Sequence, residues 1–488
     1  MRSKGNINIR VILYVIGNLL VIQSVLMLLA VPWSIYYNSH DLGAILISAV
    51  FTGIVGGLMF FSNSGQRHAE IGKREGYLIV TLSWVFMALF GAVPYLVSGA
   101  IPNFSNAFFE SISGFSTTGA TILTDIEAVP KGILFWRSMT QWIGGLGIIV
   151  LTIAILPLLG IGGMELFAAE APGPTKDKIH PRIKETAKRL WVIYIALTVS
   201  EIILLKIAGL SFYDAFNHAL TSCSTGGFST KNASVAAFQS PWVHWIIIIF
   251  MFLAGTNFSM LYYGGKGNFK KFTENSEFKW YATWIVVLVA MLLPVVYIHT
   301  DAGIGKDFTD VVFQVVSIVT TTGYATADYT HWGVFASMVF FLLMFSGGSA
   351  GSTSGSIKIV RIVLLIKNGF SELKRRLHPK AVIPVYMNNH PVGQDIIYNL
   401  LAFIFLYIFI FVISTMMLTL LEIDILTAMS AAATCLGNVG PGLASIGPSE
   451  NFYHLSPIAK WILSFLMIAG RLEVFTVIIL FSPHFWRR

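Results

Sequence analysis

Long apolar segments alternate with short polar connections along the whole chain. A helix crosses the hydrocarbon core of a bilayer with about 20 mostly apolar residues, and segments of that length recur from end to end. We predict ten spans, two leading ones followed by four pairs: 11–36 and 42–62; 77–99 with 136–159; 190–210 with 241–263; 280–299 with 332–368; and 396–421 with 457–482. The pattern is typical of an all-α polytopic membrane protein.

The composition agrees with a membrane protein. Apolar residues make up 55% of the 488 residues and charged residues only 11%, whereas soluble domains carry about 25% charged residues. A chain of this length could hold several soluble domains, but the spread of apolar segments predicts one multi-pass unit. We do not expect the first segment to be a cleaved signal, because its apolar run is too long and no small-residue cleavage site follows it.

Positively charged residues mark one side of the predicted bundle. The net charge is +8, and most of the 32 Lys and Arg residues lie at the two ends of the chain and near 63–76, 160–189, 262–279 and 356–394. Cytoplasmic connections of membrane proteins are enriched in Lys and Arg. We therefore predict that both termini are cytoplasmic. Because the basic residues are scattered over many connections, we expect no nucleic-acid partner.

A short polar motif that ends in glycine occurs once inside each of the four pairs. The copies align without gaps: AFFESISGFSTTG (107–119), AFNHALTSCSTGG (215–227), VVFQVVSIVTTTG (311–323) and AMSAAATCLGNVG (428–440). Each copy follows a residue of a type that caps helices: Asn106, Asp214, Asp310 and Thr427. We interpret each copy as a short helix followed by a glycine turn.

The length of this motif suits a helix that enters the membrane without crossing it. About 12 helical residues span roughly 18 Å, about half of the hydrocarbon thickness. Irregular backbone at that depth is tolerated only where it is buried in protein or lines a watery cavity. A single copy could be a surface loop with turn residues, but four copies between four pairs of spans favour a central pore. Units of two spans keep one orientation, which makes them parallel repeats about the membrane normal.

The chemistry of the glycine turns resides in the backbone. Glycine permits the dihedral angles that let successive carbonyls point the same way, and a ring of carbonyls can replace the water shell of a monovalent cation. The negative C-terminal end of each short helix also favours cations. One turn, ThrThrThrGlyTyr (320–324), approaches the known pattern of potassium filters.

These motifs resemble the Trk/Ktr/HKT superfamily of potassium transporters, and the two leading spans resemble its bacterial TrkH/TrkG type. The resemblance covers essentially the whole chain. It implies four parallel units of span, pore helix and span around a central pore, with K+ bound at the filter. It also implies a homodimer in the lipid of the bacterial cytoplasmic (inner) membrane and a cytoplasmic TrkA-like ring that binds NAD and ATP or ADP. No organic cofactor is expected in this chain.

The resemblance also assigns the filter residues. They are Thr117, Thr118 and Gly119; Thr225, Gly226 and Gly227; Thr321, Thr322 and Gly323; and Asn438, Val439 and Gly440. Sodium-preferring relatives carry serine at the first filter glycine, so Gly119 favours potassium over sodium. The fourth turn lacks the threonine-rich run of the others. We divide the chain into leading spans (1–70) and four units: 71–163, 164–265, 266–368 and 369–488.

A glycine-rich stretch interrupts the second span of the third unit. The sequence GGSAGSTSGS (347–356) cannot hold a stable helix, because glycine is a poor helix former and serine and threonine compete for backbone hydrogen bonds. We predict two half-helices joined by an intramembrane loop, a gate below the filter that includes Gly347, Gly348, Ser349, Ala350 and Gly351. A nucleotide-binding loop is excluded because no GxxxxGK[ST] match is present. Glycines at a similar depth in other spans, Gly144, Gly145 and Gly255, are expected to allow close helix packing.

Arg471 lies in the middle of the last span. An arginine at that depth is costly and normally faces the bundle interior or a cavity. Facing the conduit it would repel cations, and by resemblance it is the pore-blocking arginine that acts with the glycine-rich loop. The alternative is a buried ion pair with Glu473 or Glu201.

Four other features have plainer interpretations. Cys223 and Cys435 are expected to be buried thiols rather than a disulfide. Glu110, near the start of the first pore helix, is stabilised by the helix dipole or draws cations to the mouth, and His218 is expected to be packed. The basic segments 176–189 and 374–376 are either docking surfaces or topology signals.

The sequence as a whole predicts a potassium-translocating membrane subunit and not an enzyme, since no loop gathers acids, histidines or nucleophiles. The alternative is a secondary potassium symporter coupled to protons or sodium. Glu201, Glu473 and Arg471 are the intramembrane charges that the sequence indicates, which is too few for a clear proton relay.

Overall fold

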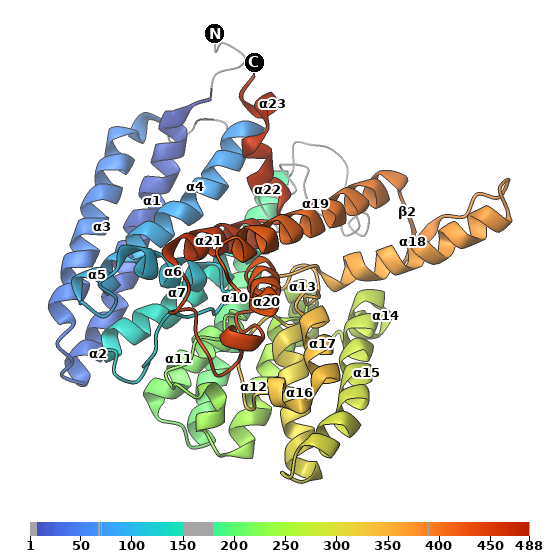
Figure 1. Ribbon diagram of the computed structural model, residues 1–488. Coiled ribbons are helices and arrows are strands. Elements are labelled where there is room, and N and C mark those ends of the chain that lie inside the picture. Colours follow the sequence, from blue (N-terminus) through green and yellow to red (C-terminus); the bar gives the residue numbers. More distant parts are fainter. Residues whose placement is uncertain (1–6, 67–68, 70, 151–178, 389, 488) are drawn as a thin grey trace.

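The computed structural model is a bundle of α-helices (Figure 1). It describes residues 7–66, 69, 71–150, 179–388 and 390–487. The end of the predicted span 136–159 and the start of the basic segment 176–189 lie outside the described residues. Within them, the only sheet is a hairpin of two antiparallel strands, β1 (Val385–Met387) and β2 (His390–Val392).

Two leading helices pack side by side at one edge of the bundle (Figure 1). They are α1 (Ile9–Met27), which α2 (Val31–Tyr36) continues, and α3 (Leu42–Ser62). Gly17 and Gly56 face each other across the pair: a Cβ added at Gly17 would lie 2.8 Å from the Gly56 carbonyl oxygen. Small residues at such a crossing let two membrane helices approach closely.

Four groups of helices follow, and each has a long helix, a shorter helix and a second apolar helix. Unit 1 contains α4 (Lys73–Gly91), α5 (Val93–Val97), α6 (Phe104–Phe115) and α7 (Lys131–Val150). Unit 2 contains α10 (Ile179–Ile207), α11 (Phe212–Cys223), α12 (Pro241–Ala254) and α13 (Phe258–Gly265). Unit 3 contains α15 (Ser276–His299), α16 (Ile304–Val319), α17 (Val334–Leu343) and α18 (Ile359–Leu377). Unit 4 contains α19 (Gln394–Thr419), α20 (Ile425–Gly437), α21 (Pro457–Arg471) and α22 (Phe475–Ile478).

Short elements complete the chain. Among the described residues, the remaining α-helices are α14 (Lys270–Glu274) and α23 (Pro483–Trp486). The 3-10 turns are η1 (Leu28–Ala30), η2 (Ser64–Gln66), η5 (Ser234–Ala237), η6 (Tyr329–Trp332), η7 (Ala444–Ile446) and η8 (Ile479–Phe481).

The prediction of an all-helical multi-pass membrane protein is confirmed. Among the described residues, six segments are long and apolar enough to cross a bilayer: Ile9–Tyr36, Leu42–Ser62, Lys73–Val97, Ala187–Ile207, Ser276–His299 and Gln394–Thr419. Two bent pairs raise the number to eight if each pair is one span. The number of ten spans stays a prediction.

The second spans of units 2, 3 and 4 are broken rather than straight. α12 and α13 are bent by 110° around Gly255, and α21 bends by 113° into the segment Phe475–Phe481. In unit 3 the chain leaves α17 at Leu343 and resumes as α18 at Ile359, which agrees with the predicted half-helices. Each break exposes backbone groups that must find partners inside the protein.

The short helices begin earlier than the sequence motif suggests. Three of them have a side-chain cap that accepts a hydrogen bond from the third residue of the helix: Asn103 from Asn106 (3.2 Å), Ser211 from Asp214 (3.0 Å) and Asp424 from Thr427 (2.9 Å). Asp310 lies inside α16, which begins after Gly303. The prediction that Asn106, Asp214, Asp310 and Thr427 are caps is therefore wrong, because a cap accepts from the third helical amide and lies before the first turn.

The two ends of the described chain meet at one end of the bundle (Figure 1). The Arg74 guanidinium donates to the Arg487 carbonyl (2.7 Å), and the Asn8 amide donates to the Glu75 carboxylate (3.1 Å). This arrangement agrees with the even number of membrane crossings that the sequence predicts.

Candidate functional site

The four short helices end in irregular segments with one shared backbone conformation. We call these segments the glycine loops: residues 116–119, 224–227, 320–323 and 437–440. In each loop the third residue from the end of the motif, counting the glycine, is a non-glycine residue with positive φ: Thr117 (53°), Thr225 (53°), Thr321 (57°) and Asn438 (53°). The glycines also have positive φ: Gly119 (84°), Gly227 (76°), Gly323 (78°) and Gly440 (105°). L-residues rarely adopt such angles, so their recurrence in all four loops indicates a common, enforced geometry.

Each short helix is closed by the same pair of backbone hydrogen bonds. The amide after the left-handed residue reaches back five residues: Thr118 to Ser113 (2.9 Å), Gly226 to Thr221 (2.8 Å), Thr322 to Ser317 (2.8 Å) and Val439 to Thr434 (2.9 Å). The left-handed residue itself reaches back three, as from Thr117 to Gly114 (2.9 Å). This is the Schellman motif, with Thr or Asn at the position that glycine usually takes.

The four glycine loops touch one another in a closed ring. A Cβ added at Gly119 would overlap the carbonyl oxygen of Gly226, the residue before the loop glycine of unit 2. The same relation holds from each unit to the next: Gly227 with the Thr322 oxygen, Gly323 with the Val439 oxygen and Gly440 with the Thr118 oxygen. The last contact returns to unit 1. A side chain at any of these glycines would therefore push a backbone carbonyl of the neighbouring unit out of the ring.

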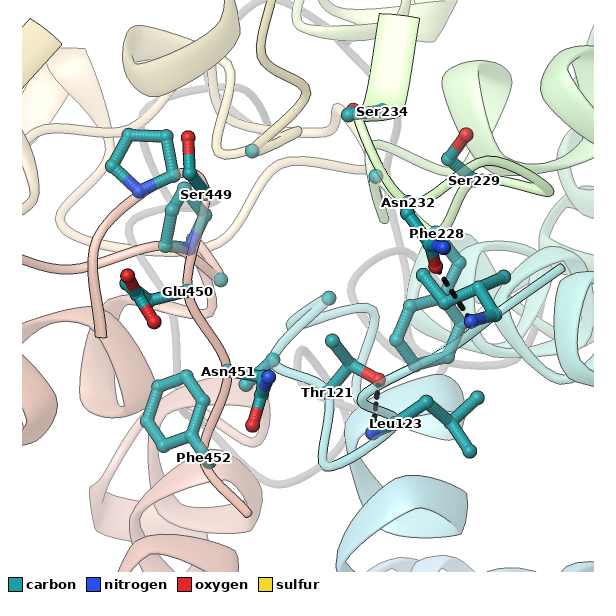
Figure 2. A pocket seen from close by; sticks show the side chains of 18 of the residues that line it. Thr121, Leu123, Phe228, Ser229, Asn232, Ser234, Ser449, Glu450, Asn451 and Phe452 are labelled. Atoms are coloured by element: carbon teal, nitrogen blue, oxygen red, sulfur yellow. Dashed lines mark hydrogen bonds between the residues drawn. The ribbon is translucent and has the colours of Figure 1, made fainter. Parts of the chain in front are cut away.

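A cavity opens on one side of this ring (Figure 2). Its volume is about 130 Å³, and its lining includes all four loop glycines together with Thr121, Ser229, Asn232 and the segment 446–452. The Asn232 side-chain amide donates to the Asp125 carboxylate (3.0 Å), and this hydrogen bond holds the pKa of Asp125 below its ordinary value. The ring therefore has a polar vestibule that is open to one surface of the protein.

The second helices of the units share a buried motif behind the ring. It is QWIGG (141–145) in unit 1, MFLAG (251–255) in unit 2, MFSGG (344–348) in unit 3 and MIAGR (467–471) in unit 4. Contacts support this alignment. A Cβ at Gly144 would overlap the Phe115 oxygen and one at Gly470 the Leu436 oxygen, in each case the fourth residue before the loop glycine of the same unit. A Cβ at Gly145 or Gly255 would also lie 2.6 Å from a tyrosine hydroxyl, so the close packing predicted at Gly144, Gly145 and Gly255 is confirmed.

Arg471 occupies the position that is glycine in the other three motifs. Its Nη1 donates to the carbonyl oxygen of Thr353 (2.7 Å), and its Nη2 to that of Gly144 (3.4 Å). The side chain is 2% exposed, and Nε has no partner. In the described part of the chain, Arg471 pairs with neither Glu473 nor Glu201.

Those two acids have other partners. Glu473 forms an ion pair with Arg361, in the first turn of α18. Glu201 accepts from the Cys223 thiol (3.2 Å). Cys223 and Cys435 are both buried free thiols, and His218 is packed between the Asp214 carbonyl (2.8 Å) and the Ser229 hydroxyl (2.9 Å).

The 344–358 loop is held by polar contacts from units 2 and 3. The Ala350 amide donates to Glu277 (2.7 Å), and the Asn257 side chain donates to the Ala350 carbonyl (2.8 Å). The Ser349 amide donates to the Gly255 carbonyl (2.8 Å), so the loop satisfies the backbone that the α12 break exposes. The buried Lys358 ammonium donates to the Ser354 carbonyl.

The loop also touches the glycine loops directly. The Gly355 amide donates to the Thr321 hydroxyl (2.6 Å), and the Thr353 hydroxyl donates to the Cys223 carbonyl (3.2 Å). The predicted gate residues Gly347, Gly348, Ser349, Ala350 and Gly351 thus lie in an irregular loop next to the ring, and Arg471 holds that loop at Thr353.

Comparison with known proteins explains this architecture. Residues 42–265 and 269–488 match the TrkH family, which is described as a cation transport protein. The chain belongs to the TrkH family. The Trk system potassium uptake protein TrkH of Salmonella typhimurium is 39% identical over 485 residues, covering 98% of this chain and 99% of that protein. The Trk system potassium uptake protein TrkG of Escherichia coli K12 is 32% identical over 488 residues, with the same coverage of each chain.

A solved member of the TrkH family has the same fold. The crystal structure of the potassium transporter TrkH from Vibrio parahaemolyticus matches with a TM-score of 0.91 and 35% identity, over 99% of this chain and 100% of that chain. The predicted resemblance is therefore confirmed. Because the TrkH family consists of cation transport proteins, the prediction that this chain is not an enzyme is confirmed too.

Several buried polar residues of this TrkH family member escaped the sequence analysis. Glu110, which the sequence suggested is stabilised by the helix dipole or draws cations, lies in the middle of α6 and not in its first turn. It is fully buried and pairs with Arg137 (2.7 Å), which also donates to the Ser229 carbonyl (3.1 Å). Glu277 and Lys358 are two further buried charges that the sequence did not single out. In the sequence, each of these buried charged residues is visible only as a charge inside or beside an apolar run. Such a pattern does not identify the residue with which the charge pairs.

Proposed function

We propose that this chain is the potassium-translocating subunit of a Trk-type uptake system. The observation that carries the proposal is the closed ring in which each loop glycine contacts a carbonyl of the next unit. Its relatives include a potassium uptake protein and a potassium transporter, which supports the choice of ion. The protein acts as a multi-pass subunit in the bacterial cytoplasmic membrane, with both termini in the cytoplasm.

In the proposed mechanism, backbone oxygens replace the hydration shell of K+. The filter consists of Thr117 to Gly119, Thr225 to Gly227, Thr321 to Gly323 and Asn438 to Gly440. Alternating positive φ values fix the directions of the carbonyls before an ion arrives, so little reorganisation is needed on binding. The short helices direct their negative ends toward the ring, which favours a cation there.

The proposed gate lies beside the filter. Gly347 to Gly351 and the following residues form the loop, and Arg471 joins it by the hydrogen bond to Thr353. A fixed positive charge next to the ion path repels K+. Conduction then requires the loop and Arg471 to move away from the path together.

A coupled potassium symporter is the second candidate. It is favoured by three buried carboxylate oxygens that have no partner among the described residues, one each on Glu201, Glu277 and Asp307. Such groups can exchange a proton during transport. Channel-like conduction and coupled transport differ in what drives the ion, and this difference is measurable.

Purified protein in lipid vesicles tests the proposed function. With a K+ gradient alone, K+ should cross the membrane of vesicles that contain the protein and not that of empty vesicles. Flux that needs a proton or sodium gradient would select the symporter instead. An absence of K+ flux and of K+ binding under all gradients would reject both.

The assembly belongs to the same proposal. We expect a homodimer that docks a TrkA-like, nucleotide-binding ring on its cytoplasmic face. The end of α18 projects from the bundle (Figure 1) and carries the basic run 374–376 in its last turn, which suits a protein contact. Light scattering of the purified protein measures the number of chains, and co-purification with a TrkA-like protein measures docking.

A further inference from the structure

The side chain of Gln141 brackets the glycine loop of unit 2. Gln141 lies in α7 of unit 1 and is fully buried. Its Nε2 donates to the carbonyl of Gly226 (2.6 Å), and its Oε1 accepts from the amide of Phe228 (3.0 Å). Both ends of the amide are therefore used on one short stretch of backbone, on either side of Gly227.

Gln141 fills the space that a side chain would occupy in the other loops. The residue before the loop glycine is Thr118, Thr322 and Val439 in units 1, 3 and 4 but Gly226 in unit 2. A Cβ added at Gly226 would overlap the Gln141 amide group. Unit 2 thus receives from its neighbour the bulk that the other units carry themselves.

The motif position that Gln141 occupies also differs between unit 1 and the other three units. The motif position of Gln141 is methionine in the other three units, at Met251, Met344 and Met467, and all three are buried. By this alignment, three units have methionine at the motif position where the loop of the next unit carries a side chain, and unit 1 has glutamine where the next loop has glycine. This internal exchange indicates that Gln141 and Gly226 belong together.

The Gly226 carbonyl is a member of the ring. Its oxygen has the same relation to Gly119 as the Thr322, Val439 and Thr118 oxygens have to the glycines of their neighbours. Gln141 donates to the Gly226 oxygen, whereas within the described residues no hydrogen-bond donor reaches the Thr118, Thr322 or Val439 oxygen. Of the four ring carbonyls, the Gly226 carbonyl is thus the one that a side chain holds in place.

We propose that Gln141 is a positioning residue that sets the ion preference of the filter through Gly226. The inference rests on the proposed function, since it assigns how that filter is held. Glycine has the largest conformational freedom of any residue. Without the two hydrogen bonds to Gln141, Gly226 can therefore adopt backbone conformations that the equivalent residues of the other loops cannot. A filter that relaxes around an ion discriminates less between K+ and the smaller Na+.

Two hydrogen bonds set the size of the effect. A net contribution near that of one ordinary hydrogen bond corresponds to about a threefold to tenfold change in an equilibrium ratio. We expect Gln141→Met, which keeps the bulk and removes both hydrogen bonds, to lower the K+ over Na+ binding ratio by that factor. Gly226→Thr is expected to do the same, because the added side chain expels the Gln141 amide.

The double variant Gln141→Met with Gly226→Thr has methionine in unit 1 and threonine in the loop of unit 2. These are residue types that the equivalent positions of other units carry. We expect the double variant to recover most of the binding ratio that each single change loses. Met251→Leu, at the equivalent buried position of unit 2, is the matched control and should keep the wild-type ratio. The binding ratio is obtained by titrating the full-length protein with KCl or NaCl and recording the shift in melting temperature, with choline chloride as the reference.

The outcomes separate a failure of this inference from a failure of the proposed function. A lower melting temperature of Gln141→Met in choline together with an unchanged K+ over Na+ ratio would show a packing role only and would overturn the inference. A double variant with a lower ratio than both single variants would overturn it too. A wild-type protein that neither binds nor conducts K+ would instead reject the proposed function, whatever the variants do.

Discussion

Arg471 donates a hydrogen bond to the carbonyl oxygen of Thr353, 2.7 Å away, and so ties the last span to the glycine-rich loop of unit 3. The two residues are 118 positions apart in the chain. The guanidinium lies where the other units have glycine, and no carboxylate in the described part of the chain neutralises it. This relationship makes Arg471 the main candidate for a charge that closes the ion path.

We expect Arg471→Ala to raise K+ flux. The change removes both the positive charge and the hydrogen bond that holds the loop, so two obstacles to a cation disappear. Tracer uptake into vesicles, normalised to the amount of folded protein, measures the effect. Arg361→Ala, which removes a nearby arginine that pairs with Glu473, is the control for loss of positive charge in general. Unchanged or abolished flux in well-folded Arg471→Ala protein would contradict the proposed role.

Gly119→Ser should weaken the preference for K+ over Na+. The serine Cβ would overlap the Gly226 carbonyl oxygen, and the left-handed backbone costs an L-residue about 1–2 kcal/mol. The ring must widen or distort to admit it, and we expect about a tenfold loss of discrimination, which corresponds to about 1.4 kcal/mol. Cation competition in vesicles is the measurement.

Gly99→Ser is the matched control for this change. Gly99 also has a positive φ of 73°, but nothing lies within 4 Å of an added Cβ. It reproduces the backbone strain without touching the ring, so its ion preference should equal that of the wild type. An identical ranking of ions in Gly119→Ser would place this glycine outside the filter.

Breaking the Glu110–Arg137 pair should destabilise the protein strongly. Both side chains are buried, and removing one partner of a buried ion pair typically costs about 3–5 kcal/mol, because a charge is left uncompensated. We expect Glu110→Leu to lower the melting temperature clearly. The double change with Arg137→Leu should lose less, since no lone charge remains.

The exposed pair of Lys231 with Glu127 provides the comparison. These side chains are 32% and 46% exposed, and surface pairs contribute about 0–1 kcal/mol. Glu127→Leu should therefore leave the melting temperature nearly unchanged. A Glu110→Leu protein as stable as Glu127→Leu would show that the buried pair is not a structural clamp.

Gly348→Ala should favour release of the 344–358 loop. The added Cβ would lie 2.5 Å from the Gly255 carbonyl oxygen, which is backbone and cannot move aside easily. We expect higher K+ flux than in wild type without loss of ion preference. Gly369→Ala, in α18 with nothing within 4 Å of the new Cβ, controls for the general effect of replacing glycine. Flux equal to that of wild type would argue that the loop does not close the path at Gly348.

Local patterns in the sequence were sufficient for the plan of the molecule. The long apolar segments and the four glycine motifs each reflect a requirement that acts over about 10 to 25 residues, namely the thickness of the bilayer and the depth of a half-membrane helix. The interrupted span at 347–356 was readable for the same reason, since glycine, serine and threonine disfavour helix wherever they cluster. The start of three short helices was misplaced by three residues, because Asn106, Asp214 and Thr427 resemble caps but donate to the actual ones, and that of α16 was misplaced by seven.

Only the tertiary structure decided which residues distant in the chain contact one another. Glu110 finds Arg137 across 27 residues, Gln141 finds Gly226 across 85, and Arg471 finds Gly144 across 327. No local pattern encodes these pairs, because each depends on how separate helices pack around the ring. The sequence by itself determined the four short helices and the glycine loop that follows each of them. Only packing, which buries polar groups and forces them to find partners, determined which side chains hold those loops in place.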